Sequence, residues 1–374
     1  MLFQSLGIDR FFSSHPGPPI DISIAMTWFE HLTGCPEDSA TAVREQLYVD
    51  GPRLHSRSIG HSWRYGKLET PTLVELRERA GGLAGEPRAT SVREVIADVQ
   101  RLHVDEDNAH ALFQVASQFN LLEMVSPEKT PDCGVGIYEW DPTQGPACAI
   151  AAGAGTIYRN YFATVNGRIG QTADNQIDCL AGLGALLGNT NQRLWRMVNG
   201  YALPSAAGLE EINAKLKATD EPGLDQLRQA LQIGLQWGTQ VTLKGASHVV
   251  SQAYCSALPV AYSGHAQTLW TPFATLVLEA AYEATFCAAI LNAERTQNNT
   301  VFLTLLGGGA FGNDLAWILQ ALRRCLHLYS NCGLDVAIVS YGRSKPCVQQ
   351  LVAEFTAGCI AELASDTDAQ LGKP

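Results

Sequence analysis

The chain has 374 residues, and 46% of them are hydrophobic, so it can bury one large core or two smaller ones. Its 37 Asp and Glu residues outnumber 26 Lys and Arg residues, and no basic cluster of about five to eight residues occurs, which argues against nucleic-acid binding. There is no continuous apolar run of about 18 residues and no leader-like N-terminus, so we expect a cytoplasmic protein that does not contact a membrane.

The first 90 residues are predicted to form a mostly helical or irregular N-terminal extension. Residues 27–34 (TWFEHLTG) indicate a short helix, and residues 73–80 (LVELRERA) form a charged segment. Glycines and a proline between residues 81 and 87 then break the chain. No chemistry is assigned to this region.

From residue 91 onward, strands are predicted to alternate with helices. We expect β-rich runs at 92–104 and 110–124, a mostly helical insertion at 163–240, strands at 240–245 and 248–262, a helix at 272–294, a strand at 301–306, a helix at 316–326 and a strand at 334–342. Apolar strands that alternate with helices favour an α/β sheet covered on both faces. The predicted domain covers residues 91–360, and residues 361–374 are predicted to be a flexible tail.

Neither the ten cysteines nor the nine histidines show the spacing of a metal site. No two cysteines have CxxC spacing, and no histidines have the HxxxH spacing of a helical metal motif. We therefore expect buried, reduced thiols, no metal and no cofactor.

The most informative segment is a glycine-rich loop between an apolar strand and an apolar helix. The strand Val301–Leu306 is followed by Gly307, Gly308, Gly309, Ala310, Phe311, Gly312 and Asn313. Consecutive glycines let the backbone approach a ligand closely and direct several N–H groups into one concavity. The next helix directs its positive dipole end to the same place. The loop is therefore predicted to bind phosphate without basic side chains.

Several segments together resemble the macrodomain superfamily, which binds ADP-ribose. They are residues 143–162 (TQGPACAIAAGAGTIYRNYF), 175–178 (NQID), 255–262 (CSALPVAY), 278–285 (LEAAYEAT) and 306–313 (LGGGAFGN). The resemblance covers about residues 91–345 and is nearest to a divergent branch of poly(ADP-ribose) glycohydrolase-like and MavL-type ADP-ribosyl hydrolases. It implies a three-layer α/β/α mixed sheet with the N-terminal extension and the helical insertion added to it.

The same resemblance implies that the chain is an ADP-ribosyl hydrolase. The GGG…QEE signature of the glycohydrolases is absent, because Leu121, Leu122 and Glu123 follow Asn120 without glycines. Removal of single ADP-ribosyl groups is therefore expected rather than cleavage between riboses. The MavL-type branch implies ADP-ribosylated arginine, as on ubiquitin, as the target, and secretion into a host cell if the protein is an effector.

The resemblance also implies roles for individual residues. Asp98 would accept a hydrogen bond from the adenine amino group, Asn120 and Phe311 would contact the distal ribose, and Tyr341 would line the adenine pocket. Gly153, Gly155 and Thr156 would form a first diphosphate loop that faces residues 307–313. Each has a simpler reading: Asp98 as a surface acid, Asn120 as a turn residue, Tyr341 as a sheet-edge residue and the glycines as helix-packing residues.

Hydrolysis at the ribose anomeric carbon passes through an oxocarbenium-like state, which requires a carboxylate. We favour Asp141, which lies in a proline-containing turn before a predicted helix, although an N-cap role is the alternative. Asp132, Glu139 and Asp314 are further candidates, and Asp314 could equally cap a helix. Asn120 completes the predicted catalytic set.

Polar residues around the predicted loops complete the ligand site. Gln144 follows the Asp141 turn and is expected to contact the ligand. Arg159 and Asn160 lie among aromatic residues, where Arg159 would bind either a diphosphate oxygen or a structural carboxylate. Asp174 and Asp178 are four residues apart on a predicted helix, and a solvated helix face is the simpler interpretation for them.

Three other functions remain open, and one of them is a structural scaffold, a part that the first 90 residues could play even within an enzyme. A binding module would recognise ADP-ribose or an ADP-ribosylated protein without cleaving it. A nucleotide-dependent oxidoreductase ranks lower, because it would carry GxGxxG after its first strand, whereas this glycine cluster follows a late strand.

Overall fold

A seven-stranded mixed sheet forms the centre of the protein. The computed structural model describes residues 26–83 and 86–371. The strands are, in spatial order, β4 (Lys67–Glu69), β11 (Gly234–Gln240), β12 (Val249–Cys255), β6 (Leu112–Ala116), β13 (Thr300–Leu303), β14 (Asp335–Ser340) and β5 (Ser91–Ile96). The five strands from β12 to β5 are parallel, and β11 is antiparallel to both of its neighbours. The carboxyl ends of β6, β13 and β14 therefore meet at one edge of the sheet.

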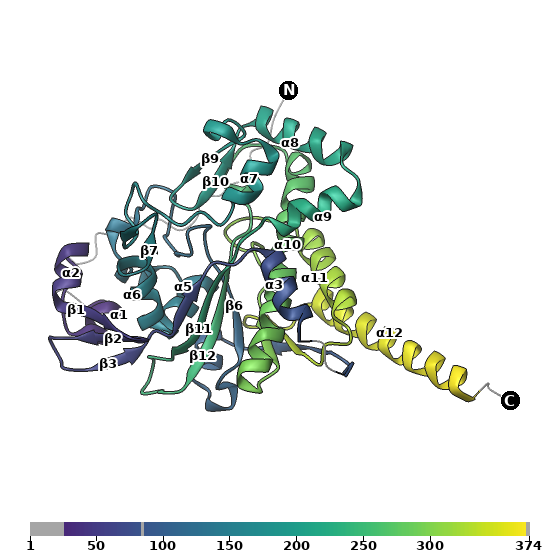
Figure 1. The fold of residues 1–374 in the computed structure, drawn as a ribbon, viewed down its shortest axis with the longest axis horizontal. Coiled ribbons are helices and arrows are strands. Elements are labelled where there is room, and N and C mark those ends of the chain that lie inside the picture. The colour runs from purple at the N-terminus through teal and green to yellow at the C-terminus, as the bar shows by residue number, and fades with distance from the viewer. Residues whose placement is uncertain (1–25, 84–85, 372–374) are drawn as a thin grey trace, which may run out of the picture.

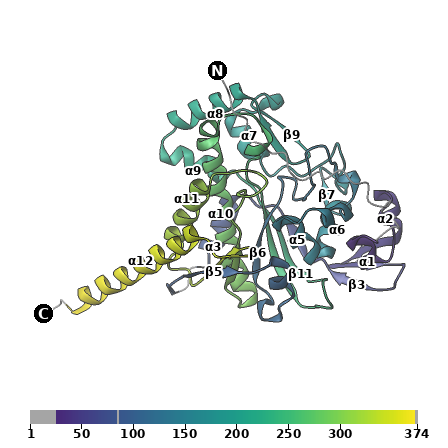
Figure 2. The same ribbon diagram turned by 180° about the vertical axis from the view of Figure 1, so that it is seen from behind.

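Helices cover both faces of the sheet, which confirms the predicted three-layer α/β/α architecture (Figures 1 and 2). One face carries α4 (Val99–Val104), α5 (Gln144–Ala151) and α6 (Gly153–Tyr161); the other carries α3 (Leu73–Gly81), α10 (Gln267–Thr296) and α11 (Leu315–Leu328). By length and composition α10 could cross a membrane, but 89% of its most apolar window is buried in the protein. Its apolar character is therefore explained by its place in the core.

The insertion between α6 and β11 contains more than helices. It includes the hairpins β7 (Thr164–Val165) with β8 (Arg168–Ile169) and β9 (Trp195–Val198) with β10 (Tyr201–Pro204), and the helices α7 (Ala181–Leu187), α8 (Ala206–Ala218) and α9 (Glu221–Gln229). Helices α8 and α9 pack against α10. The last residues of the predicted insertion belong to β11, a strand of the central sheet.

The N-terminal region contributes to two cores. Helices α1 (Trp28–Thr33) and α2 (Ala40–Gln46) accompany a three-stranded antiparallel sheet of β1 (Leu47–Asp50), β2 (Arg53–Ser56) and β3 (Ser62–Arg64). This small sheet was not expected from the sequence. Its buried side chains pack with residues from 122–161, whereas β4 and α3 join the main sheet and its core. The predicted boundary at residue 90 therefore does not separate two cores.

Three further segments differ from the prediction. Residues 99–104 form α4, because the side chain of Asp98 accepts hydrogen bonds from the first turn and stops the preceding strand. Residues 110–124 form a strand only as far as Ala116. Residues 361–371, predicted as a flexible tail, continue helix α12 (Pro346–Leu371), which projects from the body (Figure 1). Short 3-10 helices occupy Glu106–Asn108, Pro131–Cys133, Gly136–Trp140, Thr190–Gln192 and Val260–Tyr262.

Candidate functional site

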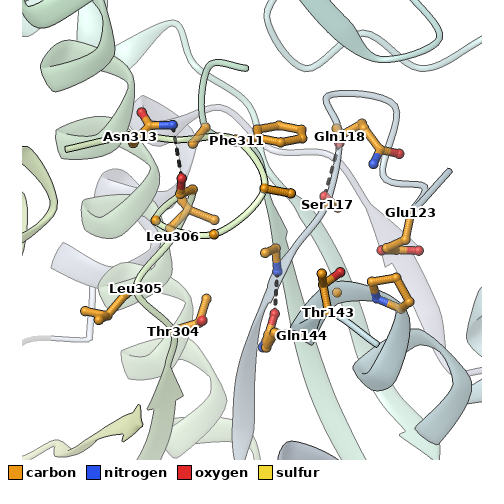
Figure 3. Close-up of a pocket in the computed structure, with 18 of the residues that line it drawn as sticks. Ser117, Gln118, Glu123, Thr143, Gln144, Thr304, Leu305, Leu306, Phe311 and Asn313 are labelled. Carbon is orange, nitrogen blue, oxygen red and sulfur yellow. Dashed lines mark hydrogen bonds between the residues drawn. The ribbon is translucent and has the colours of Figure 1, made fainter. Parts of the chain in front are cut away.

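A pocket of about 370 Å³ lies at the carboxyl edge of the parallel strands. The segments that follow β6, β13 and β14 line it, together with the start of α5 and Tyr201 of β10. Figure 3 shows Leu306 and Asn313 on one side of the pocket, with Gln118, Glu123 and Thr143 on the other. Its size and its place at the ends of parallel strands are typical of a small-molecule site.

The glycine-rich loop forms one wall of this pocket, as its sequence predicts. Residues 307–311 and Asn313 line the cavity, and Gly308, Gly309 and Ala310 are exposed. Within the described chain, the backbone amides of Gly309, Ala310 and Phe311 have no acceptor, whereas those of Gly308, Gly312 and Asn313 bond to loop carbonyls. Consecutive unpaired amides in one turn can bind an anion such as a phosphate.

Two side chains fix the shape of the loop. The Nδ2 of Asn313 donates to the carbonyl oxygen of Leu258 at 2.8 Å, which ties the loop to the segment after β12. The hydroxyl of Tyr282, from α10, donates to the carbonyl of Thr304 at 2.7 Å and accepts from the amide of Leu306 at 2.9 Å. The structure therefore gives Asn313 a loop-shaping role in addition to its place in the pocket wall.

Two glycines of the loop are required by its backbone, and one is not. Gly307 and Gly312 have φ angles of 75° and 70°, and an added Cβ at either position would overlap a neighbouring side chain. At Gly309, in contrast, a Cβ would have no atom within 4 Å. Gly309 is therefore the position where a side chain would block the pocket without disturbing the fold.

Glu123 is the main functional candidate that the sequence analysis missed. Its side chain lines the pocket but is only 1% exposed, and neither carboxyl oxygen has a hydrogen-bond partner in the described chain. Burial raises the pKa of Glu123 from its ordinary 4.5 to about 8, against the opposing effect of Arg159 and with a contribution from Asp141. An acid with a strongly perturbed pKa in a pocket is a typical catalytic group.

Arg159 lies beneath Glu123 and is fully buried. Its Nε donates to the carbonyl of Leu121 at 3.0 Å, one terminal nitrogen donates to Thr156 Oγ1 at 3.1 Å, and the guanidinium stacks on Tyr254 at 3.6 Å. That nitrogen is 3.9 Å from Glu123, too far for a hydrogen bond. The pair is therefore loose, and desolvation determines the pKa of Glu123. Arg159 supports the catalytic candidate rather than lining the pocket.

The backbone before Glu123 has an unusual conformation. Leu121 has a φ of 64°, in the left-handed region that aliphatic residues rarely adopt. Its carbonyl receives the Arg159 hydrogen bond, and Asn120 Oδ1 accepts from the amide of Leu122 at 3.1 Å. This turn directs Glu123 into the pocket, and its strain is typical of functional sites.

The start of α5 forms the wall beside Glu123. Gln144 accepts from the amide of Ala116 at 2.9 Å and donates to the carbonyl of Gln114 at 2.8 Å, so its amide ties α5 to β6. A Cβ on Gly145 would overlap the carbonyl of Ala116. Asp141 lines the pocket, half-buried, and accepts from the amide of Thr143 at 2.9 Å. The favoured carboxylate is thus in the pocket together with Glu123.

Three aromatic side chains form a further wall of the pocket. The rings of Tyr201, Tyr262 and Phe311 lie 5.2–5.7 Å apart, and the hydroxyl of Tyr201 donates to the carbonyl of Met124 at 2.8 Å. The insertion thereby holds the segment that carries Glu123. Tyr341, 77% exposed, and Lys345 lie at the edge of the pocket.

The predicted first diphosphate loop is wrong. Gly153, Gly155 and Thr156 lie in α6 and are buried away from the pocket. A Cβ on Gly153 would meet Trp28 at 2.7 Å, and one on Gly155 would meet Thr239 Oγ1 at 2.9 Å. These are packing glycines, which let α6 approach β11 and the N-terminal region closely. Thr156 donates to the carbonyl of Ala149 and accepts from Arg159.

The remaining predicted residues do not line the pocket. Asp98 and Asp314 cap α4 and α11, and Glu139 accepts from the amide of Trp28 at 3.0 Å. Asn120 and Asn160 are buried and make hydrogen bonds to Gln176 and to the carbonyl of Pro131. Asp132 accepts from the amide of Ala173. Asp174 lies in a turn and Asp178 in an irregular segment, so the two are not on one helix. Their contacts here are structural.

A signal for Glu123 is present in the sequence. Residues 119–125 (FNLLEMV) are apolar apart from Asn120 and Glu123, and they follow a buried strand. An acid in such a segment is expected to be buried, and a buried acid at the end of a strand is a candidate for chemistry. Ser117, Gln118, Tyr201, Tyr262 and Lys345 also line the pocket without having been predicted. Within the described ranges, no group of three or more His, Cys, Asp or Glu side chains could hold a metal ion.

Comparison with known proteins gives distant structural matches. No family model matches the chain, and no curated protein matches it in sequence. The poly(ADP-ribose) glycohydrolase of Deinococcus radiodurans in complex with ADP-ribose aligns with a TM-score of 0.43 at 11% identity, over 78% of this chain and 95% of that chain. The poly(ADP-ribose) glycohydrolase of Thermomonospora curvata aligns with a TM-score of 0.43 at 13% identity, over 84% and 96% of the two chains.

Proposed function

We propose that the protein binds ADP-ribose in this pocket and hydrolyses the bond between the distal ribose and a modified protein side chain. The observation that carries the proposal is the buried carboxyl group of Glu123 in the same pocket as the backbone amides of residues 309–311 of the glycine-rich loop, none of which has a hydrogen-bond partner among the residues that the structure describes. The amides would hold the diphosphate, and the rings of Phe311 and Tyr341 would pack against ribose and adenine. The sequence resemblance to ADP-ribosyl hydrolases supports this choice of ligand.

Two carboxyl groups in one pocket can divide the chemistry of hydrolysis. Because its pKa is about 8, Glu123 is mostly protonated at neutral pH and can donate a proton to the leaving atom. Asp141 can accept a proton from the attacking water while the bond from the anomeric carbon to the leaving atom breaks. The products are free ADP-ribose and the unmodified side chain.

The protonated Glu123 favours a hydroxyl-derived oxygen as the leaving atom. An alkoxide needs a proton as it departs, whereas a carboxylate or a protonated guanidine departs without help from a general acid. The resemblance to MavL-type enzymes instead supports arginine, as on ubiquitin. Serine-linked and arginine-linked ADP-ribosylated peptides therefore distinguish the two, and we expect faster release from the serine-linked peptide.

The proposal is tested by calorimetry with ADP-ribose and by release of ADP-ribose from a modified protein. We expect wild-type protein to bind and to release ADP-ribose, and Glu123→Gln and Asp141→Ala to bind with little release. Release by wild type should decrease above about pH 8, as Glu123 loses its proton. Binding without release by the wild type would identify a reader module, and absence of binding would refute the proposed ligand.

A further inference from the structure

A second cavity, of about 450 Å³, lies next to the proposed active site. The hairpin β9–β10, the segment around Pro259 and the start of α10 enclose it. Tyr262 lines both cavities, and Tyr201 and Leu203 of the same strand β10 face one cavity each. A part of a ligand that extends out of the first pocket past Tyr262 would therefore enter the second cavity.

The wall of the second cavity includes a tryptophan whose buried donor lacks a partner among the described residues. The indole of Trp270 lines the cavity and is fully buried, and its Nε1–H has no acceptor among the described residues. An indole N–H can only donate a hydrogen bond, and a buried donor without a partner is unfavourable. The site is therefore suited to a ligand that brings a hydrogen-bond acceptor.

The charge of the cavity points to an anionic acceptor. Arg196 lies on its rim, exposed, and makes no ion pair within the described chain. The other arginine of the lining, Arg193, is already neutralised by two short hydrogen bonds to Glu211. Among the described residues that line this cavity, none is acidic, although the whole chain has a net charge of -11.

We propose that this cavity binds the protein side of the substrate, and that Trp270 and Arg196 receive a carboxylate from an acidic peptide segment beside the modified residue. The proposal rests on the proposed hydrolase function. One free guanidinium and one N–H match the single charge of a carboxylate, whereas a diphosphate would bring two charges. The apolar side chains of the wall, from Leu194, Trp195, Leu203 and Pro259, suit the remainder of a peptide.

The test compares two serine-linked ADP-ribosylated peptides that differ only in having Glu or Gln next to the modified residue. With wild-type protein, we expect a KM about fivefold lower for the acidic peptide and a similar kcat. Arg196→Gln should remove this preference, Arg196→Lys should retain part of it, and the control Arg101→Gln, an exposed arginine of α4, should leave it unchanged. Trp270→Phe, which keeps a ring but removes the N–H, should also lose the preference. None of these variants should change the affinity for free ADP-ribose.

The outcomes separate the subsite from the proposed function. Equal KM values for the two peptides, with normal release and normal ADP-ribose binding, would refute the subsite alone. The subsite would also be refuted if Arg196→Gln slowed the release of ADP-ribose from poly(ADP-ribose) but not from the peptides, because the cavity would then bind phosphate. Absence of both ADP-ribose binding and release would refute the proposed function itself. If Trp270→Phe does not fold, the two peptides and the Arg196 variants still decide the question.

Discussion

Replacing Glu123 with glutamine should abolish turnover and at the same time stabilise the protein in a pH-dependent way. The pKa of Glu123 is raised from 4.5 to about 8 by burial, so the folded protein binds more protons than the unfolded chain between these pH values. The free energy of unfolding of the wild type therefore decreases as pH rises through this range. The glutamine of the variant would have the same size as the glutamate but no charge to bury.

The size of the effect follows from the two pKa values. The loss of unfolding free energy that the raised pKa of Glu123 causes in the wild type is about 1 kcal/mol at pH 5, about 3 kcal/mol at pH 7 and about 4 kcal/mol at pH 8. Relative to low pH, the unfolding free energy of Glu123→Gln minus that of the wild type should increase by these amounts. Any cost of burying the new amide is independent of pH and does not affect the increase. Both oxygens of Glu123 lack partners in the described chain, so the substitution breaks no side-chain hydrogen bond.

Urea unfolding of both proteins at pH 5, 6, 7 and 8 measures this difference. The control is Glu139→Gln, because Glu139 is exposed and its substitution removes no buried charge. A difference that stays constant from pH 5 to pH 8 would refute the assignment of a protonated, buried acid in the pocket. If Glu123→Gln is more stable than the wild type but inactive, Glu123 is retained for function at the expense of stability.

Three further predictions concern the loop, the helix contact and the ion pairs. Gly309→Glu should lose ADP-ribose binding in calorimetry without unfolding, since the position is open, and Gly81→Glu, equally open at the end of α3, should bind normally. Gly145→Ala should destabilise the protein by about 1–3 kcal/mol in urea unfolding, because its Cβ overlaps the Ala116 carbonyl. Glu283→Ala should cost about 3 kcal/mol, because it removes the buried carboxylate that Arg77 and Arg324 share, while Arg77 keeps its pair with Asp225. The two arginines lower the pKa of Glu283 despite its burial, so the wild type should lose the stability that Glu283 contributes as pH falls through the folded-state pKa of this group. A midpoint of urea unfolding that is the same for Glu283→Ala and the wild type would refute this role.

The sequence predicts features that depend on neighbouring residues and misses those that depend on distant ones. The glycine-rich loop was predicted because its strand, glycines and helix are consecutive, and the structure places it in the pocket wall. Gly153 and Gly155 have a similar local pattern, yet they serve packing against Trp28 and Thr239, which are both distant from them in the sequence. Local sequence cannot distinguish a glycine that admits a ligand from one that admits another helix or strand.

The same limit explains why Glu123 was missed. Its surroundings include Tyr138 and Arg159, with Tyr254 packed under Arg159, and these residues belong to three different elements; its direction depends on the left-handed turn at Leu121. Asp141, in contrast, was found from a local proline turn, and it does line the pocket. The fold class followed from alternating strands and helices, but the positions of β4 and α3 in the main sheet and core depend on pairing with β11 and packing on α10.

In the proposed complex, backbone amides of the glycine-rich loop hold a diphosphate while Glu123 faces the anomeric carbon. The most direct test is a crystal structure of Glu123→Gln with ADP-ribose bound. We expect the diphosphate within hydrogen-bond distance of the amides of Gly309, Ala310 and Phe311, and the distal ribose next to residue 123. A nucleotide bound elsewhere, or a pocket left empty at saturating ADP-ribose, would contradict it.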